Sequence, residues 1–301
     1  MKLWPFIFAA AANLFWAGNA IVGKLAASTI APFSLSFYRW LLACIILLPF
    51  AWVAVSRQRQ WYWQERKLIF ALAILSVTVF NTFQYLALNF TAPTNVSMVI
   101  ATMPIFILAL TSFMQKQSIK KHQWLGTGTA LVGVLMVIWQ GGGKAGINPG
   151  DLIMVLAVFC FALYSVLLKR VPEHISPTGL TFVLMAVGTL GILPFYLWDL
   201  YQQEAIPWAD WETWYILIYV ATLPSIGSYY CWNYAVKKGG PILTGLSINL
   251  LPVFTLILSI ALLGTALNGW QVLPIGLIFA GVWQAMGYPL LKSQTPQQSA
   301  S

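Results

Sequence analysis

Long apolar segments, each about the length of a membrane-spanning helix, recur from one end of the chain to the other. Of the 301 residues, 59% are hydrophobic and 8% are charged, whereas a soluble domain carries about 25% charged residues. A helix needs about 20 apolar residues to cross a bilayer, and these runs form blocks rather than the alternating pattern of a β-barrel. We therefore predict an all-α polytopic membrane protein whose ten transmembrane helices span residues 5–24, 33–55, 68–89, 93–114, 123–140, 151–170, 177–198, 213–236, 241–263 and 270–291.

Positive charges gather on one side of this arrangement. Thirteen of the 16 Lys and Arg residues fall in the even-numbered loops and the two tails, and the opposite side carries mostly acidic loop residues. Because cytoplasmic loops retain Lys and Arg, both termini are predicted to be cytoplasmic. We expect a multi-pass protein of the plasma membrane, the inner membrane in a bacterium. The net charge of +9 is then explained by topology, and we expect the lipid bilayer rather than nucleic acid as its partner.

The chain matches itself at two nearly equal offsets. A shift of 145 residues places Lys24 and Pro32 on Lys169 and Pro177, and a shift of 148 relates the second set of residues, Pro93, Pro104, Gly128 and Gly133, to Pro241, Pro252, Gly276 and Gly281. Coincidences of Pro, Gly and Lys at a fixed offset indicate duplication.

Each predicted repeat has five spans, so the second repeat must enter the membrane upside down relative to the first. This arrangement is an inverted repeat with a pseudo-two-fold axis in the membrane plane. We predict a first repeat at residues 1–140, a linker at 141–150, a second, inverted repeat at 151–291 and a disordered cytoplasmic tail at 292–301. Spans 5 and 10 are rich in glycine, which suits close helix packing or the seam of a homodimer.

No Asp or Glu falls at mid-membrane depth in any predicted span. Proton-coupled carriers commonly use such a carboxylate. His122 and His174 lie near loops without a metal or catalytic partner at helical spacing, and the three cysteines form no metal motif. We therefore predict no catalytic residues, no metal, no cofactor and no enzyme activity.

Uncharged polar and aromatic residues show more pattern. In span 3, Asn81, Gln84 and Tyr85 share one helical face, and the 148 shift relates that face to one in span 8. A cavity lined in this way suits a small amphiphilic metabolite, although such residues also often hydrogen-bond neighbouring helices only. The predicted substrate-binding residues are Trp16, Asn19, Arg39, Asn81, Gln84, Tyr85, Asn95, Tyr164, Ser165, Tyr229, Trp232, Asn233 and Asn249.

Two features of this set stand apart. Arg39 lies about two turns inside span 2, where a guanidinium is costly in lipid; it anchors an anionic group such as a substrate carboxylate, or else snorkels to the headgroups or binds carbonyls at helix ends. Pro104 and Pro252 occupy matching positions inside spans 4 and 9. They are predicted hinges for alternating access, with static kinks as the alternative.

Several motifs resemble the EamA type of the drug/metabolite transporter superfamily. They are the run Trp16–Ala17–Gly18–Asn19, the run Phe37–Tyr38–Arg39–Trp40, and the segments Met103–Pro104–Ile105–Phe106 and Leu251–Pro252–Val253–Phe254. The resemblance implies a ten-helix exporter with a central cavity between the halves. Among the branches of the superfamily, the chain is most similar to the YddG-type amino-acid exporters. Many members carry a Glu after spans 4 and 9, and none is present here.

These observations together predict a transporter that exports small metabolites, most of all aromatic or neutral amino acids, by facilitated alternating access rather than proton coupling. An exchanger of phosphorylated sugars, nucleotide sugars or drugs is the alternative within the superfamily, although the sugar substrates would want more cations at mid-depth. A lipid scramblase or an intramembrane enzyme is the alternative of another class.

Overall fold

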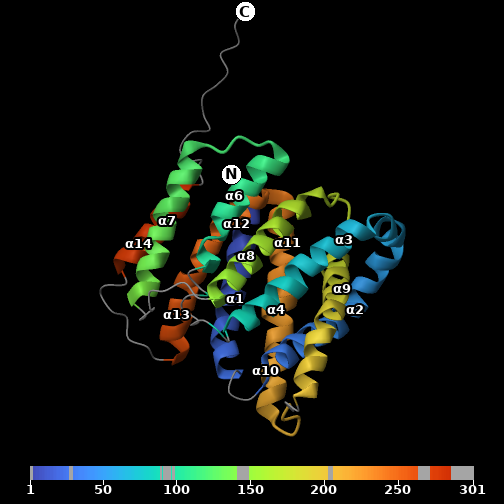
Figure 1. The fold of residues 1–301 in the computed structure, drawn as a ribbon. Helices are drawn as coiled ribbons and strands as arrows, with labels where there is room; N and C mark the ends of the chain where they lie inside the picture. Colours follow the sequence, from blue (N-terminus) through green and yellow to red (C-terminus); the bar gives the residue numbers. More distant parts are fainter. Residues whose placement is uncertain are drawn as a thin grey trace, which may run out of the picture.

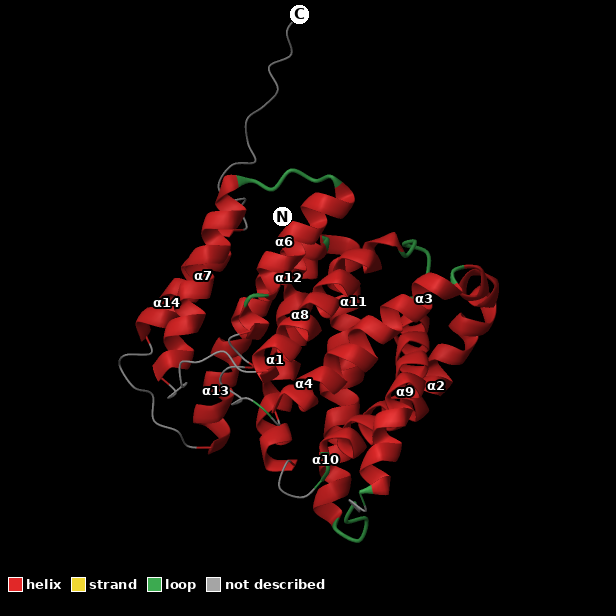
Figure 2. Cartoon of the chain, viewed as in Figure 1, coloured by secondary structure: helices red, strands yellow, loops and turns green. Residues whose placement is uncertain are grey.

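The computed structural model describes residues 3–26, 30–88, 90, 96, 99–140, 149–202, 206–263 and 272–285. All regular secondary structure in these residues is helical (Figure 2). Five of the helical stretches are long and apolar enough to cross a membrane: Pro32–Gln64, Arg66–Gln84, Pro149–Arg170, Pro177–Tyr201 and Pro241–Leu262. Large apolar side chains also lie on the outside of the molecule; Phe113, for example, is 85% exposed. An apolar exterior is the expected surface of a protein solvated by lipid.

Corresponding helices occupy corresponding places in the two halves (Figure 1). The first half contains α1 (Leu3–Ala26), α2 (Pro32–Gln64), α3 (Arg66–Ala73), the π-helical segment η1 (Ile74–Val79), α4 (Phe80–Leu88), α6 (Met103–Gln115) and α7 (Lys121–Gln140). The second half contains α8 (Pro149–Leu167), η2 (Leu168–Arg170), α9 (Pro177–Tyr201), α10 (Trp211–Ala221), the π-helical η3 (Thr222–Gly227), α11 (Ser228–Gly239), α12 (Pro241–Ser247), η4 (Ile248–Leu250), α13 (Leu251–Leu263) and α14 (Val272–Ala285).

The two offsets found in the sequence recur in these bounds. Helices α2 and α9 both begin at a proline, and those prolines are 145 residues apart. The π-helical segments η1 and η3 begin and end 148 residues apart, as do α6 and α13. The duplication is therefore a property of the backbone as well as of the sequence.

The two halves interlock rather than packing as separate bundles. Helix α1 of the first half packs on α11 of the second, and its counterpart α8 packs on α4. The same reciprocity relates the pair α1 and α13 to the pair α8 and α6. Each of these contacts therefore has a counterpart in which the equivalent helices of the two halves have changed places. Such reciprocal contacts indicate a pseudo-two-fold axis.

Helices α2 and α9 show how that axis lies. Ser34 near the start of α2 is bonded to Asp199 near the end of α9, so the two helices run antiparallel. At their crossing the thiol of Cys44 lies 4.0 Å from the hydroxyl of Thr189, which is its counterpart at the 145 shift. A two-fold axis that relates antiparallel helices is perpendicular to them. It passes between these two residues.

Helices α7 and α14, the counterparts of predicted spans 5 and 10, form a close antiparallel pair at one edge of the molecule (Figure 1). A Cβ atom at Gly133 would lie 2.7 Å from the carbonyl oxygen of Pro274, and Cβ atoms at Gly126 and Gly281 would overlap backbone atoms of the opposite helix. These glycines therefore serve helix packing within the chain. Gly128 and Gly276 face open space, and a homodimer through this edge stays a prediction.

The two predicted hinge prolines each lie at the beginning of an α-helix, directly after a turn or a 3₁₀ segment. Pro104 is the second residue of α6, and Pro252 is the second residue of α13, which follows the short 3₁₀ segment η4. Their role as hinges for alternating access stays a prediction. The chain interrupts the helix just before each proline, where a missing N–H costs little. Discontinuous helices of this kind occur at the binding sites of many transporters.

Candidate substrate site between the halves

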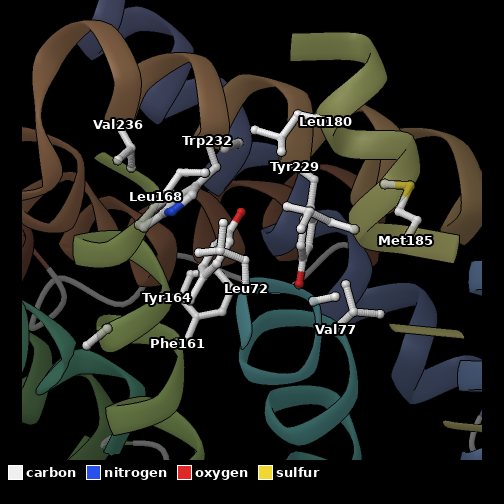
Figure 3. Close-up of a cluster of buried hydrophobic side chains, with 14 of the residues drawn as sticks. Leu72, Val77, Phe161, Tyr164, Leu168, Leu180, Met185, Tyr229, Trp232 and Val236 are labelled. Atoms are coloured by element: carbon white, nitrogen blue, oxygen red, sulfur yellow. The ribbon is translucent and has the colours of Figure 1, made fainter. Parts of the chain in front are cut away.

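Aromatic rings from both halves meet near the pseudo-two-fold axis. The ring centroid of Trp16 lies 5.8 Å from that of Phe161, its counterpart at the 145 shift, and 5.2 Å from that of Trp232. Tyr229 approaches Trp16 at 6.3 Å, and Phe80 approaches Phe161 at 4.7 Å. These five residues form what we call the central aromatic cluster. Figure 3 shows Phe161, Tyr229 and Trp232 gathered in the interior between helices of different halves.

Hydroxyl and amide groups of the second half border this cluster and are hydrogen-bonded to one another. The indole N–H of Trp232 donates to the Ser165 hydroxyl at 3.1 Å, and the Tyr164 hydroxyl donates to the Asn233 side-chain oxygen. The Asn233 amide in turn donates to the Thr181 hydroxyl at 3.1 Å. All of these residues are buried. The network joins α8, α9 and α11 behind the aromatic rings.

The two π-helical segments present equivalent backbone carbonyls to the opposite half. Ser76 in η1 and Pro224 in η3 are 148 residues apart. The Ser76 carbonyl accepts a 2.7 Å hydrogen bond from the hydroxyl of Tyr229, and a second bond from Asn81. Figure 3 shows the Tyr229 ring pointing toward the helix that carries Val77. A π-helical turn disturbs the regular hydrogen-bond ladder and often marks a functional site.

Arg39 donates a hydrogen bond to the second of these carbonyls, that of Pro224. Its Nε donates to the Ser225 hydroxyl at 2.6 Å, and its Nη2 donates to the Pro224 carbonyl at 3.3 Å. The residue is only 4% exposed. Of the three interpretations open from the sequence, snorkelling to the headgroups is excluded by this burial. Arg39 binds backbone and hydroxyl oxygen beside a helix interruption inside the protein.

Other predicted site residues are not joined to the central cluster by a contact that the structure shows. Asn19 and Gln84 are half-buried on α1 and α4. Asn249 is buried on η4, and neither polar atom of its amide has a hydrogen-bond partner. Asn95 and the side chain of Tyr85 lie outside the described residues. For all thirteen residues, contact with a substrate stays a prediction.

Residues that the sequence interpretation did not select also lie in the site. Phe161 and Trp40 contribute rings, with Trp40 4.9 Å from Tyr229, and Ser76, Thr181 and Ser225 contribute oxygen atoms. The 145 shift does pair Phe161 with Trp16, although Phe161 was not included among the predicted substrate-binding residues. The backbone carbonyl of Ser76 had no signal in the sequence, because it becomes available only through the π-helical turn.

The central aromatic cluster is closely packed in this structure. Trp232 and Phe161 are almost completely buried. A hollow of about 170 Å³ lies elsewhere, lined by Met114, Gln115, Val166, Lys169 and Arg170 at the predicted cytoplasmic ends of α6 and α8. The central groups are thus gathered but closed, and a ligand would have to separate the rings.

Lysine side chains form hydrogen bonds and an ion pair between the predicted cytoplasmic end of α11 and the segment between α8 and α9. Lys169 Nζ donates to the Lys237 carbonyl at 2.7 Å, and Lys237 Nζ donates to the Ile175 carbonyl at 2.8 Å. Lys238 pairs with Glu173 at 2.6 Å. Burial, together with the neighbouring charge of Lys238, lowers the pKa of Lys237 to about 8. These bonds close the interface between α11 and the second-half loop on that side.

The described residues are all-helical, include several membrane-span-like helices and form two related halves, as expected of a polytopic membrane protein. The model of the EamA-like transporter family matches the chain twice, at residues 3–139 and 148–286. The chain belongs to this family, and the resemblance to EamA-type members of the drug/metabolite transporter superfamily is confirmed. It is therefore a membrane transporter by family.

Relatives extend over nearly the whole chain. An uncharacterized transporter of Bacillus subtilis, YyaM, is 28% identical over 295 residues, covering 96% of this chain and 95% of its own. A protein of Salmonella typhimurium described as a "probable amino-acid metabolite efflux pump" is 25% identical, covering 89% of this chain and 90% of its own. A crystal structure superimposes with a TM-score of 0.75 at 18% identity, covering 95% and 97% of the two chains. That likeness supports the fold alone.

Proposed function

We propose that this transporter exports small metabolites, most of all aromatic and neutral amino acids, by alternating access between its two halves. It would lie in the plasma membrane with ten spans, an inverted repeat and both termini in the cytoplasm. The main supporting observation is the central aromatic cluster, in which rings of both halves meet on the pseudo-two-fold axis. Side chains that meet there separate whenever the halves rock apart, and a substrate with an apolar body takes their place.

The chemistry of the cluster favours amino acids over more highly charged cargo. Its neighbours are indole, phenol, hydroxyl and amide groups, with Arg39 as the cation nearby. A carrier of phosphorylated sugars or nucleotide sugars would need several cations to neutralise phosphate. The Salmonella relative named as an amino-acid metabolite efflux pump agrees with this choice of substrate.

The position of the acidic residues supports facilitated transport. Asp151, Glu173, Asp199, Asp210 and Glu212 all lie at helix ends or in loops, away from the central cluster. Glu65 is likewise at the junction of α2 and α3. Because none of these described carboxylates lies at the centre to take up a proton, the substrate moves down its own gradient.

The function is tested by counterflow in liposomes reconstituted with the full chain. Preloaded unlabelled phenylalanine should drive uptake of labelled phenylalanine without a pH gradient, and a panel of other amino acids should then rank the substrates. Trp16→Ala should reduce this flux by about tenfold, because the loss of about 1.4 kcal/mol of aromatic contact corresponds to that factor. Trp211→Ala is the matched control, since Trp211 is 77% exposed at the start of α10.

Three outcomes would each contradict the proposal. Flux that requires a pH gradient would replace facilitated transport by proton coupling. Phospholipid flipping in the same liposomes without amino-acid flux would favour a scramblase. Equal flux in Trp16→Ala and Trp211→Ala would remove the central aromatic cluster from the pathway.

A further inference from the structure

Arg39 is a buried cation whose hydrogen-bonding capacity is only partly used. It is the eighth residue of α2, about 10 Å along the helix axis from its first residue. Both of its acceptors, the Ser225 hydroxyl and the Pro224 carbonyl, are neutral. Within the described residues Nη1 has no hydrogen bond, and no carboxylate lies within ion-pair distance of the guanidinium. Buried charges in proteins are normally paired, because an unpaired charge loses its hydration without compensation.

Two further polar atoms on the same helix face are buried without a partner. Neither the indole N–H of Trp40 nor the hydroxyl of Ser36 has a hydrogen-bond partner, although the two residues are 0% and 1% exposed. Ser36, Arg39 and Trp40 stand at i, i+3 and i+4, so their side chains share one side of α2. The Arg39 guanidinium carbon lies 4.8 Å from the Trp40 ring centroid. Unsatisfied buried polar atoms are rare and require an explanation.

These three groups can all donate hydrogen bonds, and one of them is positively charged. Such a set matches the oxygens of a carboxylate, which accept several hydrogen bonds and favour a guanidinium. The set also adjoins the central aromatic cluster through Tyr229, whose ring lies 4.9 Å from Trp40 and 6.3 Å from Trp16. A molecule with a carboxylate at one end and an apolar ring at the other fits this arrangement, in which the hydrogen-bond donors of α2 adjoin the central aromatic cluster.

We propose that Arg39, the Trp40 indole N–H and the Ser36 hydroxyl bind the carboxylate of the transported molecule. This assignment rests on the proposed function, because it presumes that a substrate enters between the halves. Arg39 then has two sets of partners. In the closed arrangement it holds the π-helical segment η3, and in the substrate-bound arrangement part of its charge is paired with the carboxylate. The site therefore selects small carboxylic acids with an apolar body and disfavours the corresponding amides and amines.

The decisive experiment compares 3-phenylpropionate with 3-phenylpropionamide, which differ only in the carboxylate. Thermal unfolding of the purified full chain in detergent reports binding without requiring transport. The acid should raise the unfolding temperature of the wild-type protein, and the amide should bind about tenfold more weakly or worse, as expected for the loss of a charge-assisted hydrogen bond.

Trp40→Phe is the sharpest variant, because it removes the indole N–H and keeps an aromatic ring under Arg39. It should lose most of the stabilisation by the acid, measured against its own unfolding temperature without ligand, which the smaller ring lowers. Trp52→Phe, on the same helix but 64% exposed, is the control and should respond to the acid as the wild type does. Arg39→Gln should respond to neither compound, and Trp40→Phe decides the matter if Arg39→Gln fails to fold.

Each alternative result overturns the assignment. No shift with the acid, an equal shift with acid and amide, or an undiminished shift in Trp40→Phe would each show that these donors do not bind a carboxylate. Counterflow of phenylalanine separates this failure from failure of the proposed function. Flux with no preference for the acid refutes the carboxylate site but leaves the transporter, whereas acid-selective binding without amino-acid flux refutes amino-acid export but leaves the site.

Discussion

The two halves meet both at the centre of the molecule and at its α7–α14 edge, but different parts of the residues make the contacts in the two places. At the edge, Gly126, Gly133 and Gly281 bring backbone close to backbone. At the centre, long aromatic and polar side chains from both halves interlock. Backbone contacts have one arrangement, whereas side chains can change rotamer and partner. We infer that the edge stays fixed during transport while the centre rearranges.

The largest effect should come from forcing the edge apart. Gly126→Leu would place side-chain atoms where backbone atoms of Ala285 lie, and neither helix can yield locally. We expect a loss of about 3 kcal/mol or more in stability, at the upper end of overpacking costs, measured as thermal unfolding in detergent. Gly128→Leu, whose Cβ meets nothing within 4 Å, should be nearly neutral. Equal losses in both would mean that the edge is not closely packed.

A change at the centre should affect transport as well as folding. Trp232→Phe keeps an aromatic ring but removes the 3.1 Å bond to Ser165 and part of the packed volume. We expect it to cost about 1–2 kcal/mol in stability and to lower phenylalanine counterflow about tenfold. For Gly126→Leu, by contrast, the expected effect is on stability. Unchanged flux in a destabilised Trp232→Phe would assign this residue to packing alone.

A smaller effect should follow from releasing one π-helical segment. Tyr229→Phe deletes the bond to the Ser76 carbonyl, which keeps its second bond from Asn81. We expect a loss of about 0.5–1.5 kcal/mol, the usual net value of one hydrogen bond. Counterflow should change in rate, because the bond joins the two halves. The double variant with Asn81→Ala should lose more than the sum of the single changes, since the carbonyl would then be buried alone.

An effect that appears only in the pH dependence of stability concerns Lys237 at the predicted cytoplasmic end. Its pKa of about 8 in the folded protein lies below the ordinary value of 10.5, so the unfolded chain binds more protons between these pH values. Stability should therefore rise as pH increases from about 8 to 10. Lys237→Met should flatten this rise in unfolding temperature, and exposed Lys67→Met should keep it. The same slope in wild type and Lys237→Met would contradict the burial of this amine.

Much of the helical framework is predictable from the sequence, because hydropathy alone locates long apolar helices. The predicted span at 177–198 lies within α9, and the span at 33–55 lies within the longer α2. The offset of 148 also predicts the equivalence of α6 and α13. Hydropathy cannot reveal the π-helical turns or the interruptions before Pro104 and Pro252. Those depend on which backbone groups find partners in the other half.

The candidate site is predictable only in part. The repeat and the face pattern select Trp16, Tyr229, Trp232 and Asn81, and the structure brings these together. The expected open cavity is absent from the described arrangement of the cluster, because a sequence that encodes two or more conformations does not state which one predominates. The role of Trp40 was also missed. A tryptophan in a span is ordinarily counted as packing, and only its unpartnered N–H distinguishes it.

The pairs on the pseudo-two-fold axis bear on the history of the chain. In a symmetric dimer of identical subunits, a residue on the axis faces its own copy, so one mutation alters both sides at once. Here thiol faces hydroxyl at Cys44 and Thr189, and indole faces phenyl at Trp16 and Phe161. The 145 shift places Leu184 opposite Arg39. Covalent fusion thus permits a single interior guanidinium, where a homodimer would bury two and bear their mutual repulsion.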